Sequence, residues 1–152
     1  MVDEISIGMA VDKNFLSVGK SLVKNSPSEK VGIFCTKNGK PSVIEYIEVS
    51  DKMANETDGH GNLVYAESHI NCNMFNIVAI EQIGAKKLPY YAAFKQSNFM
   101  DTKGDVVEAT GPNSYKFESF IFDSFEEINS MLILRVKREE EFAPIKNATR
   151  KR

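Results

Sequence analysis

The chain has 152 residues, of which 42% are apolar and 26% are charged, and these are the proportions of an ordinary globular domain. Nineteen basic and twenty-one acidic residues give a net charge of −2, which is too balanced for a surface that binds nucleic acid. No apolar run approaches the ~18 residues of a membrane-spanning helix, and the N-terminal region lacks the basic-then-apolar order of a signal peptide. We therefore expect a cytoplasmic protein without a membrane or nucleic-acid partner.

The first third of the chain predicts two strands separated by a helix. Apolar residues alternate with small or polar ones over 4–11, and they recur at helical spacing over 15–23. An apolar run over 31–35 follows, so we expect a crossover unit with two parallel strands. The Asn-Gly pair at 38–39 then predicts a tight turn into a strand over 42–49, because these residues accept the positive φ angles of a type I′ hairpin.

The middle of the chain predicts mostly loop and helix. We expect a polar loop over 51–62 and a short extended segment over 63–66. Helical spacing predicts a helix over 75–84 that ends at a glycine, and a further helix over 89–95.

The last third has the clearest periodicity. Several residues lie three or four positions apart and predict an amphipathic helix with an aromatic stripe. They are Phe117, Phe120, Ile121, Ser124, Phe125 and Ile128. The apolar run over 131–136 predicts a buried strand, so the elements together predict one α/β domain.

Generic catalytic motifs are missing from this sequence. His60 and His69 have no cysteine or carboxylate at zinc-ligand spacing, and Cys35 and Cys72 stand apart as single thiols. There is no G-x-S-x-G elbow, no P-loop and no G-x-G-x-x-G loop. The residues alone therefore predict no hydrolase, no zinc site and no phosphate-binding glycine loop.

Three ordered segments resemble the eukaryotic UDP-N-acetylhexosamine pyrophosphorylases, which make UDP-N-acetylglucosamine from UTP and N-acetylglucosamine 1-phosphate. Val-Gly at 31–32 with V-I-E-Y-I-E-V-S over 43–50 is similar to the family's V-G and V-V-E-Y-S-E-I-S. G-P-N-S-Y-K over 111–116 with F-I-F-D over 120–123 is similar to P-N-G-I-K and F-V-F-D. R-E-E-E-F-A-P-I-K-N over 138–147 is similar to R-E-D-E-F-S-P-L-K-N. The resemblance implies a partial nucleotide-diphospho-sugar transferase fold, with a Rossmann-like mixed sheet and flanking helices.

The resemblance assigns sugar-binding roles by position. Glu45, with Tyr46 beside it, falls on the family's carboxylate that accepts hydrogen bonds from sugar hydroxyls. Gly32 falls where the family's backbone approaches the sugar, because a glycine has no Cβ. Phe120 and Phe122 fall near the N-acetyl group, although packing within the helix stripe accounts for both equally well.

Charged residues complete the implied site. Lys116 falls on the family's UTP-contacting lysine and Lys146 on its sugar-phosphate lysine, and we take both as catalytic. A sugar-phosphate oxygen attacks the α-phosphorus of UTP, and because it is already an anion the site must supply alignment and positive charge rather than a base. Asp3 falls on an aspartate that helps to hold the nucleotide and Mg²⁺, although it lies several residues closer to Gly32 than is usual in the family.

The sequence also departs from the family pattern. S-H-I-N-C-N-M-F over 68–75 aligns with G-N-I-x-N-H-F-F, so His69 replaces the asparagine that contacts the sugar, and Cys72 replaces a later asparagine. Asn71 or Asn73 could compensate for these changes. The identity of the sugar therefore stays open.

Nothing in the chain corresponds to the family's L-x-G-G-x-G-T-x-x-G loop, which wraps the UTP phosphates, or to its small C-terminal domain. We therefore expect 1–147 to be the C-terminal half of the catalytic domain and 148–152 to be a basic tail. We also expect little or no turnover by this polypeptide alone, and an exposed sheet edge that can pair with a partner.

The leading hypothesis is a uridylyltransferase that forms UDP-N-acetylglucosamine and pyrophosphate from UTP and N-acetylglucosamine 1-phosphate, with this chain carrying mainly the sugar-phosphate side. Two alternatives stay open. One is a non-catalytic sugar-phosphate-binding or interaction module derived from the family, and the other is a pyrophosphorylase for another UDP-sugar.

Overall fold

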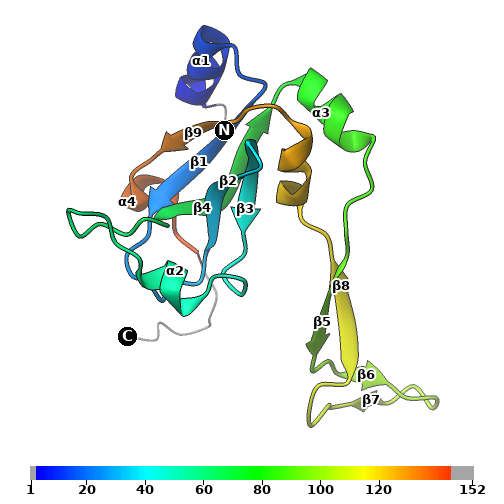
Figure 1. The fold of residues 1–152 in the computed structure, drawn as a ribbon. Helices are drawn as coiled ribbons and strands as arrows, with labels where there is room; N and C mark the ends of the chain where they lie inside the picture. Colours follow the sequence, from blue (N-terminus) through cyan, green and yellow to red (C-terminus); the bar gives the residue numbers. More distant parts are fainter. Residues whose placement is uncertain (1–2, 145–152) are drawn as a thin grey trace.

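A five-stranded mixed sheet organises the chain in the computed structural model, which describes residues 3–144 (Figure 1). Its strand order is β3-β2-β4-β1-β9. The bounds are β1 (Ser17–Val23), β2 (Gly32–Lys37), β3 (Lys40–Ile44), β4 (Glu67–Phe75) and β9 (Leu132–Arg135). Strand β1 pairs antiparallel with β4 and parallel with β9, and β2 pairs antiparallel with both of its neighbours. The predicted α/β class and mixed sheet are confirmed.

The first two predicted elements are wrong, because a helix and a strand exchange places. Residues Glu4–Lys13 form helix α1, in which Asp3 Oδ1 accepts the N–H of Ser6 at 2.9 Å and Asn14 ends the helix at φ 55°. The alternating apolar residues that suggested a strand do not mark a buried face, since Val11 is 77% exposed. The segment predicted as a helix is β1, whose residues are buried from Ser17 to Leu22 and so lack a two-residue pattern.

The predicted crossover unit is also wrong, because its first strand is helix α1 and its helix is strand β1. In the sheet, β4 separates β1 from β2. The β2–β3 hairpin is confirmed, with Asn38 at φ 51° and Gly39 at φ 76°. Its second strand ends at Ile44, earlier than predicted. The segment predicted as a polar loop begins with the short helix α2 (Asp51–Asn55).

Helix α3 (Ile77–Gly84) and strand β9 are confirmed. The predicted aromatic helix is wrong. Its second half forms the 3₁₀ helix η1 (Ile121–Glu127), and its start belongs to strand β8 (Ser114–Glu118). The segment predicted as a helix over 89–95 is instead β5 (Tyr91–Lys95), which pairs antiparallel with β8. Of the predicted stripe, Ser124, Phe125 and Ile128 are buried, whereas Phe117 is 65% exposed and Ile121 is 41% exposed. Phe122, which lies outside the predicted stripe, is buried in the core instead.

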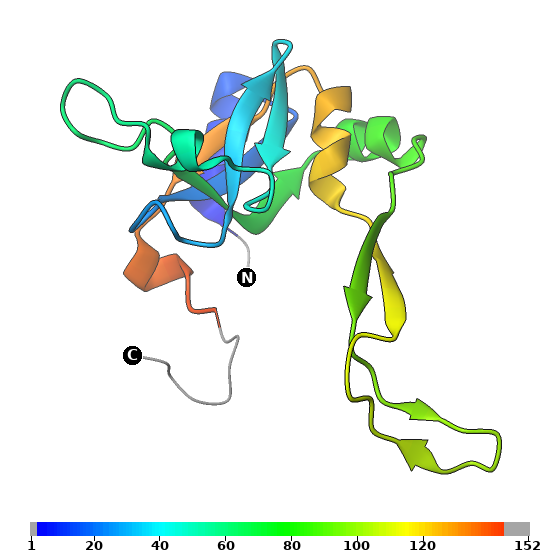
Figure 2. The same cartoon turned by 60° about the horizontal axis from the view of Figure 1, so that its bottom comes forward.

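The β5–β8 ribbon forms an arm that projects away from the sheet (Figure 2). A smaller pair at its end consists of β6 (Phe99–Met100) and β7 (Val106–Val107). Aromatic side chains along the arm stay exposed, and the rings of Phe94 and Tyr115 lie 4.8 Å apart.

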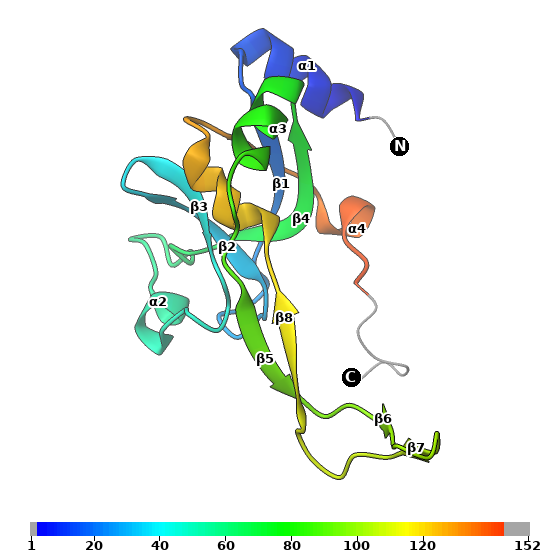
Figure 3. The same ribbon diagram turned by 90° about the vertical axis from the view of Figure 1, so that its right-hand side faces the viewer.

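Helices flank the sheet on both sides. Helix η1 and α3 pack over one face, where the core residues Val43, Phe122 and Phe125 gather. Helix α4 (Arg138–Glu141) lies on the other side of β1 and β4 from η1 (Figure 3). Within residues 3–144, no helix is both long enough and apolar enough to cross a bilayer.

Candidate functional site

Three of the predicted sugar-binding residues meet where β2, the end of β3 and β4 come together. Gly32 on β2 is the register partner of His69 on β4. A Cβ built on Gly32 would lie 3.0 Å from Val43 Cγ1 and 3.4 Å from Glu45 Oε1. Because Gly32 has no side chain, the Glu45 carboxylate lies close to the β2 backbone. A site that presents a backbone and a carboxylate to the same sugar requires this arrangement.

An aromatic wall continues from this point. The ring of His69 lies 5.7 Å from that of Phe122, and Phe122 stacks on Phe120 with 4.8 Å between centroids and 9° between planes. Phe120 lies 5.2 Å from the ring of Tyr91 on the arm. The structure thus brings the predicted Phe120 and Phe122 to the same group as His69 and Gly32.

Tyr91 and Asp123 form a polar contact beside this wall that sequence reasoning missed. The Tyr91 hydroxyl donates to Asp123 Oδ1 at 3.0 Å, while Asp123 Oδ2 is buried without a hydrogen-bond partner among the described residues. Burial, the bond to Asp123, and the nearby Glu48 and Glu45 carboxylates raise the pKa of Tyr91 to about 12. No motif indicated Tyr91, because its segment was predicted as a helix.

His69 is a buried core residue with an 8% exposed side chain. Burial lowers the pKa of its imidazole to about 4, so the ring is neutral near pH 7. Its Nε2 lies 3.2 Å from the Asn73 amide nitrogen, and Asn73 Oδ1 has no hydrogen-bond partner within residues 3–144. Direct contact of His69 with a sugar stays a prediction, and so does compensation by Asn71 or Asn73.

Lys116 and Tyr46 lie apart from the Gly32 group. Lys116 is on β8, where its ammonium pairs with Glu118 at 2.7 Å, and Glu118 is the register partner of Tyr91. Because side chains two residues apart on a strand share a face, Lys116 lies on the Tyr91 face of the arm, one step nearer its tip. Tyr46 instead lines a pocket of about 190 Å³ that also includes Lys24. Lys146 lies outside the described residues.

Asp3 lies on the opposite face of the sheet from His69. Its Oδ1 caps α1, and its Oδ2 pairs with the ammonium of Lys20 on β1, which holds the pKa of the Asp3 carboxyl at about 2. Lys20 and Ser21 are neighbours on β1, so their side chains point to opposite faces of the sheet. Ser21 is the register partner of His69 and shares its face. The structure therefore does not bring Asp3 to the Gly32 group.

Comparison with known proteins shows which proteins this chain is similar to. No family model matches the chain. The chain is 36% identical over 152 residues to UDP-N-acetylhexosamine pyrophosphorylase-like protein 1 of Xenopus tropicalis, and the match covers 97% of this chain and 30% of the relative. It is 33% identical over 153 residues to the UDP-N-acetylglucosamine pyrophosphorylase of Saccharomyces cerevisiae, covering 97% of this chain and 32% of that protein.

The fold agrees with this match. The crystal structure of the Trypanosoma brucei UDP-N-acetylglucosamine pyrophosphorylase in complex with an inhibitor superposes with a TM-score of 0.73 at 30% identity, over 95% of this chain and 28% of that one. The chain is homologous to one segment of the UDP-N-acetylhexosamine pyrophosphorylase family. It spans about 30% of the length of the curated relatives that it matches.

The family resemblance implies Mg²⁺, so we tested whether Asp3 fits that role. Magnesium in proteins is commonly held by one or two carboxylates together with substrate phosphates. Both Asp3 oxygens are already engaged, one by the α1 backbone and one by Lys20, so a metal there would stand beside an ammonium group. Residues 3–144 contain no group of three or more histidine, cysteine or acidic side chains that could hold a metal. Asp3 therefore does not fit a magnesium ligand, and the metal stays a prediction through which we derive no step.

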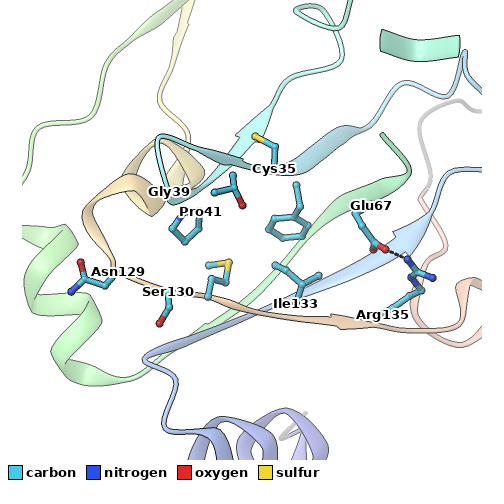
Figure 4. Close-up of a pocket in the computed structure, with 11 residues that line it drawn as sticks. Cys35, Gly39, Pro41, Glu67, Asn129, Ser130, Ile133 and Arg135 are labelled. Atoms are coloured by element: carbon cyan, nitrogen blue, oxygen red, sulfur yellow. Dashed lines mark hydrogen bonds and ion pairs between the residues drawn. The ribbon is translucent and has the colours of Figure 1, made fainter. Parts of the chain in front are cut away.

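A pocket of about 630 Å³ lies on the same face as His69, but none of the predicted pyrophosphorylase site residues line it (Figure 4). Phe34, Pro41 and Ile133 contribute apolar walls. At one end Glu67 pairs with Arg135 and accepts a hydrogen bond from Ser21 at 2.7 Å. Because Glu67 neutralises the guanidinium, this pocket does not present a free positive charge for a phosphate.

Proposed function

We propose that this chain forms the sugar-phosphate side of a uridylyltransferase. The reaction joins UTP and an N-acetylhexosamine 1-phosphate, with N-acetylglucosamine as the first candidate, into the UDP-sugar and releases pyrophosphate. The observation that carries the proposal is the position of the Glu45 carboxylate, which lies beside Gly32 at the start of the aromatic wall. The homology with pyrophosphorylases supports it.

Each member of this group has a chemical role in the proposal. The ionised Glu45 accepts hydrogen bonds from sugar hydroxyls, and the bare backbone of Gly32 lets the ring approach. The partly exposed ring of Phe120, which stacks on the buried Phe122, offers an apolar surface to the methyl of the N-acetyl group. These contacts hold the sugar phosphate so that its oxygen can be aligned for attack.

The two lysines supply positive charge during the transfer. A sugar-phosphate oxygen bonds to the α-phosphorus of UTP while the bond to pyrophosphate breaks, so negative charge builds up on crowded phosphates. Lys146 stabilises the sugar phosphate and Lys116 the UTP side. Lys116 can exchange Glu118 for a phosphate at little cost, because an ion pair whose lysine is 61% exposed is weak.

The burial of His69 favours a second candidate. The family's asparagine at this position contacts the sugar, whereas the His69 ring is enclosed by Phe34, Phe122 and Phe125. A site that has lost one sugar hydrogen bond suits a different hexose 1-phosphate, such as that of glucose or galactosamine. It also suits a module that binds a sugar phosphate without catalysing uridylyl transfer. The cytoplasmic location and the pairing of a sheet edge with a partner stay predictions.

Calorimetric titration of N-acetylglucosamine 1-phosphate into the 152-residue chain tests the proposal. We expect Glu45→Gln and Lys146→Ala to weaken binding about 10- to 100-fold, the range for loss of a charged hydrogen bond. Glu81→Gln on α3 and Lys151→Ala in the basic tail are the matched controls and should bind like the wild type. Equal affinity in all five proteins would refute this site.

A panel of sugar 1-phosphates separates the candidates. Preference for N-acetylglucosamine 1-phosphate supports the leading proposal, and preference for glucose or galactosamine 1-phosphate supports the second. Adding UTP and measuring pyrophosphate then separates transfer from binding alone. This second measurement also tests the prediction of slow or no pyrophosphate release by the 152-residue polypeptide.

A further inference from the structure

Tyr91 connects the aromatic wall to Lys116. It is the first residue of β5, and its ring lies 5.2 Å from that of Phe120 at the end of the wall. Its register partner on β8 is Glu118, and Lys116 lies two residues along the same face of the arm. A ligand that reaches from Phe120 toward Lys116 therefore passes Tyr91, which is 39% exposed.

The Tyr91 hydroxyl is oriented as a hydrogen-bond acceptor. It donates its single hydrogen to Asp123 Oδ1 at 3.0 Å, so it offers a ligand the lone pairs of its oxygen. Asp123 is itself held in the first turn of η1, where its backbone N–H donates to the Phe120 carbonyl oxygen at 3.1 Å. The pair therefore places a fixed acceptor beside Phe120.

The charged groups around this hydroxyl are acceptors as well. Burial, the bond to Asp123 and the carboxylates of Glu48 and Glu45 raise the pKa of Tyr91, so both glutamates lie near it. Glu48 Oε2 also accepts the backbone N–H of Glu45 at 3.0 Å. Because ionised carboxylates accept hydrogen bonds and repel anions, this position suits the hydrogen-bond donors of a sugar rather than its phosphate.

The acetamido group of an N-acetyl sugar offers such a donor. Its amide nitrogen lies about 2.4 Å from its methyl carbon, since both are bonded to the same carbonyl carbon. A methyl group packed on Phe120 therefore brings the amide N–H beside the Tyr91 side chain. We propose that Tyr91 determines specificity for N-acetyl sugars by accepting this N–H on its hydroxyl oxygen, and that Asp123 positions the hydroxyl. The inference rests on the proposed function, in which Phe120 contacts the N-acetyl methyl group.

Calorimetric titration of two sugar phosphates into two tyrosine variants of the 152-residue chain tests this inference. Tyr91→Phe removes the acceptor and keeps the ring, and Tyr90→Phe makes the same change at a neighbour that is 76% exposed. The ligands are N-acetylglucosamine 1-phosphate and 2-deoxyglucose 1-phosphate, which carries no donor at the corresponding carbon. We expect Tyr91→Phe to bind the first sugar about tenfold more weakly than the wild type, as the loss of one hydrogen bond predicts, and the second within about threefold. Tyr90→Phe should bind both sugars like the wild type.

Asp123→Ala tests the positioning role. It leaves Tyr91 in place but frees its hydroxyl hydrogen, so we expect binding of N-acetylglucosamine 1-phosphate to weaken about three- to tenfold, again with little change for the 2-deoxy sugar. In the double variant the two losses should not add, because both act through the same hydroxyl. Where Asp123→Ala does not fold, Tyr91→Phe decides the inference by itself.

The outcomes separate the inference from the proposed function. A loss confined to the N-acetyl sugar supports the inference, whereas an equal loss for both sugars overturns it, because a tyrosine that only supports the fold would affect them alike. Equal affinity of Tyr91→Phe and Tyr90→Phe for N-acetylglucosamine 1-phosphate also overturns it, whatever the second sugar does, and the proposed function then stands if Glu45→Gln weakens binding. If the wild type binds neither sugar, the proposed function and this inference both fail.

Discussion

The imidazole of His69 packs edge-on against Phe34, with 4.8 Å between ring centroids and 75° between planes. Phe122 and Phe125 lie 5.7 and 5.9 Å away on its other sides. A charged imidazolium would have to enter this apolar group without water, which explains why burial lowers its pKa to about 4. The packing of His69 therefore makes the stability of the core depend on pH.

We predict that His69→Asn removes an acid-sensitive part of the free energy of unfolding. Between about pH 6.5 and pH 4 the unfolded chain takes up a proton at His69 and the folded chain does not, so stability falls as the pH is lowered through this window. The loss from pH 7 to pH 4.5 should be about 2–3 kcal/mol larger in the wild type than in the variant. Urea unfolding at both pH values measures it.

His60→Asn is the matched control for this experiment. His60 lies in an exposed loop, so its replacement should leave the pH dependence of the wild type unchanged. Parallel stability losses in the wild type and His69→Asn would contradict the assignment.

Replacing Gly32 by alanine should damage both packing and the candidate site. The new Cβ would lie 3.0 Å from Val43 Cγ1, so that buried side chain must give by a few tenths of an ångström, and it would be in van der Waals contact with Glu45 Oε1 at 3.4 Å. We expect a stability loss of about 1–3 kcal/mol, typical of overpacking. Binding of N-acetylglucosamine 1-phosphate should weaken at least about tenfold, because the new methyl group covers the backbone that the sugar approaches beside Glu45.

Gly8→Ala supplies the comparison, because nothing lies within 4 Å of a Cβ at that position. In the middle of α1 this change should stabilise the chain by about 0.5–1 kcal/mol. Chemical denaturation and calorimetry on both variants check the pair. Unchanged sugar-phosphate affinity in a folded Gly32→Ala protein would argue against Glu45 as a ligand.

Tyr91→Phe should loosen the junction between the arm and η1. The change removes the hydroxyl that donates to Asp123, whose other oxygen already lacks a partner within residues 3–144. We expect a stability loss of about 1–2 kcal/mol from this unpaired acceptor, together with faster hydrogen exchange along β5 and β8. Tyr90→Phe, at a neighbouring side chain that is 76% exposed, should change neither measurement. Identical denaturation curves for the two variants would show that the Tyr91 contact is dispensable.

Features that depend on neighbours in sequence were predictable here. The hairpin at Asn38 and Gly39 needs only two residues that accept positive φ angles, and both adopt them. Helix α3 carries its own cap, since Asn76 accepts the N–H of Ala79 at 2.9 Å. The motifs around Glu45 and Lys146 indicated the similarity to the pyrophosphorylases, because they reflect residue identity rather than conformation.

Between residues 4 and 23 the predicted strand is a helix and the predicted helix is a strand. The tertiary structure decided this difference. Strand β1 gains its bonds from β4 and β9, whose residues lie about 50 and more than 100 positions away, and burial on both faces leaves no two-residue pattern to find. The same holds for the Lys20 contacts, since Asp3 and Glu141 meet only after the sheet has formed. The sequence by itself determined the similarity to the pyrophosphorylases and the local turns, because these depend on residue identity and on near neighbours. Long-range burial and charge pairing decided which residues face the site.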